Sequence, residues 1–212
     1  MAKANGVQNH PLYGVHPAVA MVQKWKSELE ARTGKSLEGW IALVKREGPT
    51  EEEARREWLK AKHKLPTNTA SWIAERAAGK GGEEDNPESY LKAAVQYVDE
   101  QYGGAKAPLR PIYDTLLQMG RALGKDVQAC PRRTIVPLYR KHVFAQIKPA
   151  TNARIDLGFA LAKHKGKLPA RLLDTGGLAK KDRITHRIEL RSVSEIDEQV
   201  KQWLKTAYDL DA

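Results

Sequence analysis

The side chains with the clearest chemical potential are basic ones gathered in one stretch of the chain. Between Arg132 and Arg191 the sequence holds eight arginines and seven lysines against four acidic residues, a net charge of +11, whereas the complete chain of 212 residues carries +10. Guanidinium and ammonium groups at this density attract anions. The stretch therefore predicts an anionic partner for this part of the chain.

The first group of basic residues lies on segments with the pattern of strands. Apolar and polar residues alternate over 143–148, 154–161 and 184–191, which is typical of antiparallel strands with one packed face. The cations at the outward positions are Lys148, Arg154, Arg187 and Arg191. We expect these four side chains to share one surface of a sheet.

Two interpretations of this surface are open. With Phe144 or Tyr139 beside the cations, the surface could contact phosphates and stack on bases, as nucleic-acid-binding sheets do. Alternatively, Asp156 and Glu189 could neutralise the arginines across the strands and leave an ordinary solvated face.

A second group of basic residues surrounds a glycine pair between the last two strands. Successive backbone N–H groups at Gly176 and Gly177 could hold an anion, with lysines adding charge. The cations of this segment are Lys163, Lys165, Lys167, Arg171, Lys180 and Lys181. The spacing GxxxxGK[ST] of a nucleotide-binding loop does not occur in the sequence. The segment is therefore either an anion-binding loop of another kind or a mobile basic loop.

An enzymatic interpretation is also open for the strands. Asp156 and the triplet Glu189-Leu190-Arg191 resemble the Asp…Glu-x-Lys arrangement of metal-dependent nucleases, in which two carboxylates hold Mg²⁺. Here an arginine replaces the lysine, and a guanidinium does not lose its proton at working pH. We therefore expect a binding protein rather than an enzyme and assign no catalytic residue, no metal and no cofactor.

The identity of the anion has one further alternative. The sheet and its covering helices could enclose a pocket for a small anionic metabolite, lined by Arg154 and Arg187. Nucleic acid is narrowly favoured over such a metabolite. The helical part of the chain offers a possible surface for a protein partner.

The elements that must position these residues change type along the chain. Apolar residues recur at helical spacing up to about residue 123, alternate like strands from about residue 126, and return to helical spacing over 194–208. Helices followed by strands and a helix are typical of an α+β fold: a small N-terminal helical bundle, then an antiparallel sheet covered by helices. The expected parts are a flexible arm over 1–16, a helical bundle domain over 17–79, a linker and connecting helix over 80–104, and an antiparallel-sheet α+β domain over 105–212.

Composition also indicates the cellular compartment in which the protein is expected. No apolar run approaches the roughly 20 residues that cross a bilayer, and the first residues lack the apolar region of a secretory signal. The one cysteine, Cys130, excludes an internal disulfide framework and fits a reducing compartment. We therefore expect a cytoplasmic protein with no membrane partner.

Two segments resemble known families. Residues about 24–78, which include KSELEARTGKSLEGWIALVKREG and WLKAKHKL, resemble the bacterial domain of unknown function 4287. Residues about 105–209 resemble domain of unknown function 5655 through KAPLRPIYDTLLQMGRALGKDVQACPRRTIVPLYRKHVFAQIKPATNARIDLGF and THRIELRSVSEIDEQVKQWLKTAYD. The resemblance implies a helical module followed by a compact sheet-and-helix domain, and it brings no activity. Similar sequences have a His- and Gly-rich turn where this chain reads KHKLPT over 62–67, so no function tied to that turn is carried over.

Overall fold

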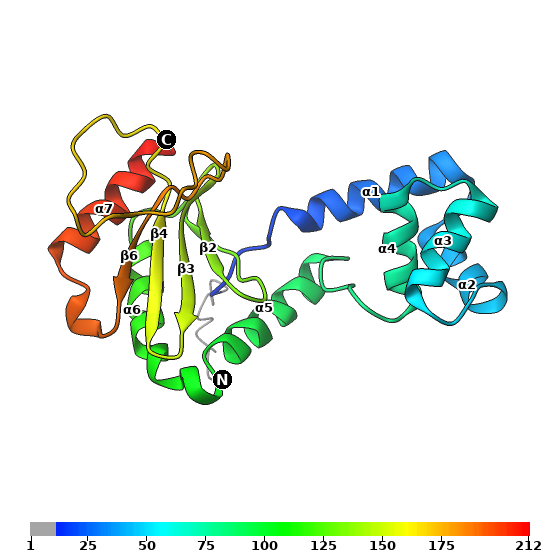
Figure 1. The fold of residues 1–212 in the computed structure, drawn as a ribbon, viewed down its shortest axis with the longest axis horizontal. Coiled ribbons are helices and arrows are strands. Elements are labelled where there is room, and N and C mark those ends of the chain that lie inside the picture. The colour runs from blue at the N-terminus through cyan, green and yellow to red at the C-terminus, as the bar shows by residue number, and fades with distance from the viewer. Residues whose placement is uncertain (1–11) are drawn as a thin grey trace, which may run out of the picture. The chain divides into compact units, whose positions relative to one another are not determined.

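The computed structural model describes residues 12–212, which divide into two compact units (Figure 1). The helical unit comprises His16–Tyr90, and the sheet unit comprises Leu91–Ala212 together with the segment before His16. The predicted α+β class is confirmed, because helices make up the first of these units and an antiparallel sheet lies in the second.

The helical unit forms around apolar residues at helical spacing. Its helices are α1 (Ala18–Thr33), α2 (Leu37–Glu47), α3 (Glu52–His63) and α4 (Thr67–Ala77). Val44, Leu59 and Ile73, one from each of the last three helices, are fully buried in its core. The Ser36 hydroxyl begins α2 by accepting the N–H of Gly39 at 3.1 Å, as N-terminal caps do. Within residues 12–212 no helix has both the length and the apolar character that a membrane crossing requires.

The sheet unit is built on six antiparallel strands in the order β1-β2-β3-β4-β6-β5. The strands are β1 (Gln128–Ala129), β2 (Val136–Tyr139), β3 (Val143–Thr151), β4 (Arg154–Phe159), β5 (Leu173–Asp174) and β6 (His186–Leu190). The three longest strands occupy the segments in which the sequence alternates. Ile147, Leu157 and Ile188 lie side by side across these strands and are fully buried, so they form the centre of the packed face.

Helices cover this packed face. The remaining elements are α5 (Pro87–Gln101), the 3-10 turn η1 (Gly104–Leu109), α6 (Arg110–Arg121), the 3-10 turn η2 (Val193–Glu195) and α7 (Glu198–Leu210). Figure 1 shows α6 and α7 on the same side of the sheet, and α7 packs against β3 and β4. Because one face is covered by helices, the outward residues of β3, β4 and β6 are collected on the other face.

One aromatic residue lies on the side opposite to the prediction. Phe144 was expected on the outward face, yet it is fully buried and its ring meets that of Tyr208 edge to face, with centroids 5.6 Å apart. Its strand contains one extra residue here, since Leu138 pairs with Ala145 while Tyr139 pairs with Val143. Such a bulge shifts the alternation of side chains. The prediction that Phe144 stacks on a base is therefore wrong.

The expected flexible arm is anchored at its end. Residues 1–11 of the arm lie outside the described residues. Tyr13 is buried, its hydroxyl lies 3.0 Å from that of Tyr113, and the Gly14 N–H donates to the Ala129 carbonyl at 2.9 Å. The segment just before the helical unit is therefore packed onto the sheet unit.

Candidate anion-binding surfaces

The outward face of the sheet brings together the residues that the alternation predicts. One row across the strands contains Lys148, Asp156 and Glu189, and the next row contains Gln146, Gly158 and Arg187. Arg154 and Arg191 flank these rows, so the four predicted cations do share one surface. Their role in anion binding stays a prediction, but their partners are defined.

The arginines of this face are held by the two carboxylates. Arg154 lies with Nε 2.9 Å from Asp156 Oδ1 and with Nη1 3.0 Å from Glu189 Oε1. Arg187 contacts the same two residues at 3.3 Å each, and Arg191 Nη2 lies 3.2 Å from Glu189 Oε2. Partial burial raises the pKa of Glu189, but the hydrogen bond from Arg187 and the charge of Arg154 outweigh this and lower it. This arrangement matches the cross-strand neutralisation rather than an open basic face.

The same contacts bear on the nuclease alternative. Asp156 and Glu189 are direct neighbours on adjacent strands, as a shared Mg²⁺ would require. However, the guanidinium groups of Arg154 and Arg187 lie against these carboxylates, where the ion would bind. Within residues 12–212 no group of three or more His, Cys, Asp or Glu side chains could hold a metal ion. The geometry therefore favours an ion-pair network over a metal centre.

We predict that this network contributes to the stability of the sheet unit. We expect Glu189→Gln to lower the free energy of unfolding by about 1 kcal/mol, because it removes the charge that three arginines share. Urea denaturation would measure the change. Glu198→Gln is the matched control, because that side chain is 88% exposed and should change stability little. Equal effects of the two substitutions would contradict a structural role for the network.

A shallow pocket of about 190 Å³ lies where the sheet face meets the glycine segment. It is lined by Lys148 and Arg187 from the sheet and, among others, by Asp156 and Asp182. The missing side chain of Gly158 leaves room for Ile184, whose Cγ2 would lie 2.6 Å from a Cβ at this position. The sheet face and the segment 175–184 therefore meet at one pocket, where acidic residues balance the two cations of the sheet face. Arg154, the other expected lining residue of a metabolite pocket, is not part of the lining.

The glycine pair does not offer its N–H groups to an anion. The Gly176 N–H donates to Asp174 Oδ1 at 2.7 Å, and the Gly177 N–H donates to Thr175 Oγ1 at 3.1 Å. A Cβ on Gly177 would lie 2.2 Å from the Ile184 carbonyl oxygen. Close packing therefore explains Gly177, and the two glycine N–H groups are not available for the expected backbone anion site, while anion binding by the lysines of this segment stays a prediction.

The cations of the long segment fall into two classes. Arg171 is bound to the start of α7, since Nη1 donates to Asp197 at 2.6 Å and Nη2 donates to the Glu195 carbonyl at 2.7 Å. Lys163 reaches the Leu210 carbonyl at 3.4 Å. The other four are exposed, and none of their ammonium groups has an ion pair or hydrogen bond within residues 12–212: Lys165, Lys167, Lys180 and Lys181.

These four lysines belong to two segments that join the strands at one end of the sheet. Residues 160–172 follow the end of β4, and residues 175–185 precede the start of β6, which is antiparallel to β4. The turn between β2 and β3 lies at this same end and adds the exposed Lys141. We call this set the basic end: Lys141, Lys165, Lys167, Lys180 and Lys181. The sequence prediction did not include Lys141, because β2 is too short to be recognised and its turn to β3 was therefore not placed.

The single cysteine has no chemical role in this arrangement. Cys130 is fully buried, and burial raises the pKa of its thiol to about 12. A thiol in this state is a poor nucleophile. Cys130 is therefore a small buried residue of the sheet unit.

Two family models match the chain in the expected order. The model described as Domain of unknown function (DUF4287) matches residues 22–78, within the helical unit, and the one described as Domain of unknown function (DUF5655) matches residues 98–211, within the sheet unit. No curated protein and no solved structure matches the chain. Because the second model covers more than half of the sequence, the chain belongs to the family described as Domain of unknown function (DUF5655).

Proposed function

We propose that this chain is a non-enzymatic cytoplasmic protein that binds the phosphate backbone of nucleic acid through the basic end of its sheet unit. The observation that carries the proposal is the contrast between the two kinds of cation. The arginines of the sheet face are paired with Asp156 and Glu189, whereas the five lysines of the basic end are exposed and unpaired among the described residues.

The chemistry of the basic end favours backbone contacts over base recognition. An ammonium group on a flexible stem is a point charge, and it lacks the planar fork with which arginine recognises bases. Of the two residues expected to stack on bases, Phe144 is buried and Tyr139 is half-buried. Binding through lysines alone follows phosphate charge and depends weakly on sequence.

A small anion on the sheet face is less well supported. The pocket there has Lys148 and Arg187 facing Asp156 and Asp182, so its formal charge is balanced. A nuclease would need the two carboxylates that the arginines hold. The arginines and carboxylates that these alternatives would use already pair with one another, whereas the lysines of the basic end have no such partners among the described residues.

The proposal is tested by binding of a labelled 20-base-pair DNA duplex to the full chain at increasing salt concentration. We expect affinity to fall steeply with salt, because lysines that bind phosphates release bound counterions. A variant with Lys165, Lys167, Lys180 and Lys181 changed to glutamine should bind about tenfold or more weakly at 0.1 M salt. Its salt dependence should be shallower by about one unit of log–log slope for each replaced lysine that binds a phosphate in the parent complex.

The control variant carries the same change in net charge elsewhere. It replaces Lys24, Lys45, Lys92 and Lys201, which are also exposed, and we expect its affinity to stay close to that of the parent chain. Duplexes of unrelated sequence should bind within a factor of a few of one another. The proposal fails if both variants lose affinity equally, or if the basic-end variant binds like the parent chain.

A further inference from the structure

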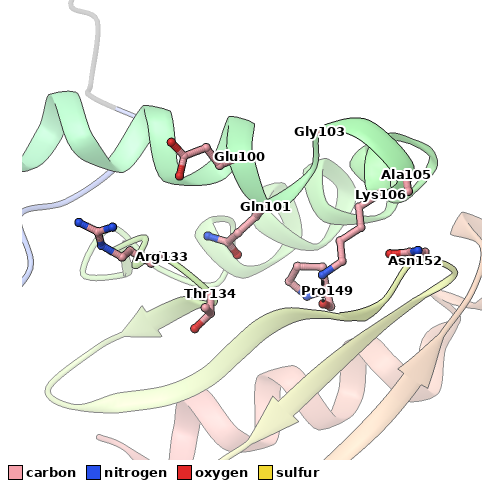
Figure 2. A pocket seen from close by; sticks show the side chains of 9 residues that line it. All are labelled: Glu100, Gln101, Gly103, Ala105, Lys106, Arg133, Thr134, Pro149 and Asn152. Carbon is pink, nitrogen blue, oxygen red and sulfur yellow. Dashed lines mark hydrogen bonds between the residues drawn. The ribbon is translucent and has the colours of Figure 1, made fainter.

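A second pocket, of about 370 Å³, opens at the other side of the sheet unit (Figure 2). The end of α5 and the start of η1 form one wall, while residues 133–134 and the turn between β3 and β4 form the other. It shares no lining residue with the sheet-face pocket. Its volume lies in the range of small-molecule sites.

A buried glutamine leaves a hydrogen-bond acceptor unused in this pocket. Gln101 is only 6% exposed, and its Nε2 donates to the Arg132 carbonyl at 2.6 Å. Because a carbonyl accepts only from N–H or O–H, this bond fixes which end of the amide is nitrogen. The amide oxygen, Oε1, is buried and has no hydrogen-bond partner within residues 12–212. In Figure 2 this oxygen points toward the space between Lys106, Pro149 and Thr134.

An unused buried acceptor is a feature that a ligand can explain. Leaving such a group unpaired costs about 1–3 kcal/mol, and buried polar groups in folded proteins are nearly always satisfied. A molecule that places an O–H or N–H beside Gln101 Oε1 would remove that cost. The glutamine therefore indicates a ligand with a hydrogen-bond donor.

The charges around the pocket indicate the rest of the ligand. Lys106 Nζ donates to the Pro149 carbonyl at 3.0 Å, which uses one of its three N–H groups. The Arg133 guanidinium lies over the Tyr97 ring at 5.6 Å. The acidic lining residue, Glu100, accepts a hydrogen bond from Gln96 at 3.0 Å, and Figure 2 shows its carboxylate turned away from Lys106. Two cations thus line the cavity, and the nearby carboxylate does not neutralise Lys106.

We infer that this pocket binds a small organic acid, with a carboxylate or a phosphate held by Lys106 and a neighbouring hydroxyl or N–H donating to Gln101 Oε1. The site is separate from the basic end. Its occupation does not depend on nucleic-acid binding, and either proposal can fail without the other.

Matched pairs of probes test this inference on the full ¹⁵N-labelled chain by NMR titration. The carboxylate pair is lactate and propionate, and the phosphate pair is glycerol 3-phosphate and propyl phosphate. Within each pair only the first carries hydroxyl donors. In at least one pair we expect the hydroxylated probe to shift the Gln101 side-chain amide and the Gly103 and Asn152 backbone signals. It should bind about fivefold more tightly than its partner.

Three variants separate the two halves of the inference. Gln101→Met should lower the affinity for the hydroxylated probe about fivefold, to that of the probe without the hydroxyl. The affinity for the probe without the hydroxyl should stay unchanged. Lys106→Met, at a half-exposed position that tolerates replacement, should lower the affinity for all four probes. Glu100→Gln should weaken none of them. Thermal melting measures whether each variant is folded. If the Gln101 variant is unfolded, the affinities of the Lys106 variant alone decide the test.

Three outcomes overturn the inference. The first is the absence of any titrating shift around the pocket at tens of millimolar probe. The second is equal affinity within both pairs, which would leave Gln101 without a role. The third is a set of shifts confined to the basic end, which would show that the anions bind there alone.

Discussion

Replacing Phe144 by alanine is expected to lower the free energy of unfolding of the sheet unit by about 3–5 kcal/mol. The side chain is fully buried, and its ring contacts that of Tyr208 on α7. Deleting it removes apolar burial and leaves a cavity between the start of β3 and the last turns of α7. The bulge holds the backbone in place, so the cavity cannot close by a simple shift of the strand.

Urea denaturation monitored by circular dichroism measures this loss. Phe144→Leu should recover most of the stability, because leucine fills much of the same volume. Val193→Ala is the surface control, because Val193 is 43% exposed, and it should change stability little. A loss below about 1 kcal/mol for Phe144→Ala would contradict the burial of this ring.

Replacing Asp211 by asparagine should cost about 2–3 kcal/mol at neutral pH. This carboxylate is 4% exposed and accepts the His142 N–H at 2.7 Å and the Arg183 Nη2 at 2.9 Å. Its other contact is the His142 ring at 3.0 Å. Asp211 thereby links the C-terminal end of α7 to the turn between β2 and β3 by hydrogen bonds. Asparagine cannot supply the charge that these groups share.

The cost should depend on pH in a defined direction. Burial raises the pKa of Asp211, but the hydrogen bonds from His142 and the charge of Arg183 outweigh it, so the pKa in the folded chain lies below its ordinary value. The carboxylate therefore contributes its full stabilisation above the unfolded pKa of about 4. This contribution is lost as pH falls through the lower, folded pKa.

Unfolding measured from pH 7 down to pH 2 checks this expectation. The difference between the parent chain and Asp211→Asn should be constant at neutral pH and shrink below about pH 4. Asp209→Asn provides the comparison, since Asp209 is exposed and contacts Lys205 on the same helix. A gap between parent and Asp211→Asn that persists unchanged at pH 2 would show that charge is not the cause.

The fold could be predicted where the apolar residues follow a regular spacing over a long segment. Long segments with a regular apolar spacing, such as 143–148 and 184–191, correspond to the strands β3 and β6. Strands of two to four residues contain at most two periods of the alternation, too few to distinguish from chance, so β1, β2 and β5 were not recognised in the sequence. The same limit applies to Phe144, because a bulge is defined by the partner strand and alternation along one strand cannot show it.

The sequence predicts which residues share the sheet face, but it does not predict which of them form ion pairs. Alternation placed Arg154 and Arg187 on one face, and it left open whether Asp156 and Glu189 neutralise them. Only the register decides this, by setting Asp156 directly beside Glu189. Gln101 lay beyond sequence reasoning altogether. A glutamine at the end of an amphipathic helix is ordinary, and its unpaired oxygen arises from the distant Arg132 carbonyl that fixes the amide.

The anchoring of Tyr13 gives the chain an insertion topology. The hydrogen bond between Tyr13 and Tyr113 closes a loop that contains the whole helical unit, His16–Tyr90. The entropic cost of closing a loop grows with the number of its flexible residues. A folded helical unit removes its residues from that count, and an unfolded one returns them. When the helical unit unfolds, the entropic cost of holding Tyr13 against Tyr113 therefore rises. Chain connectivity alone thus couples the stabilities of the two units.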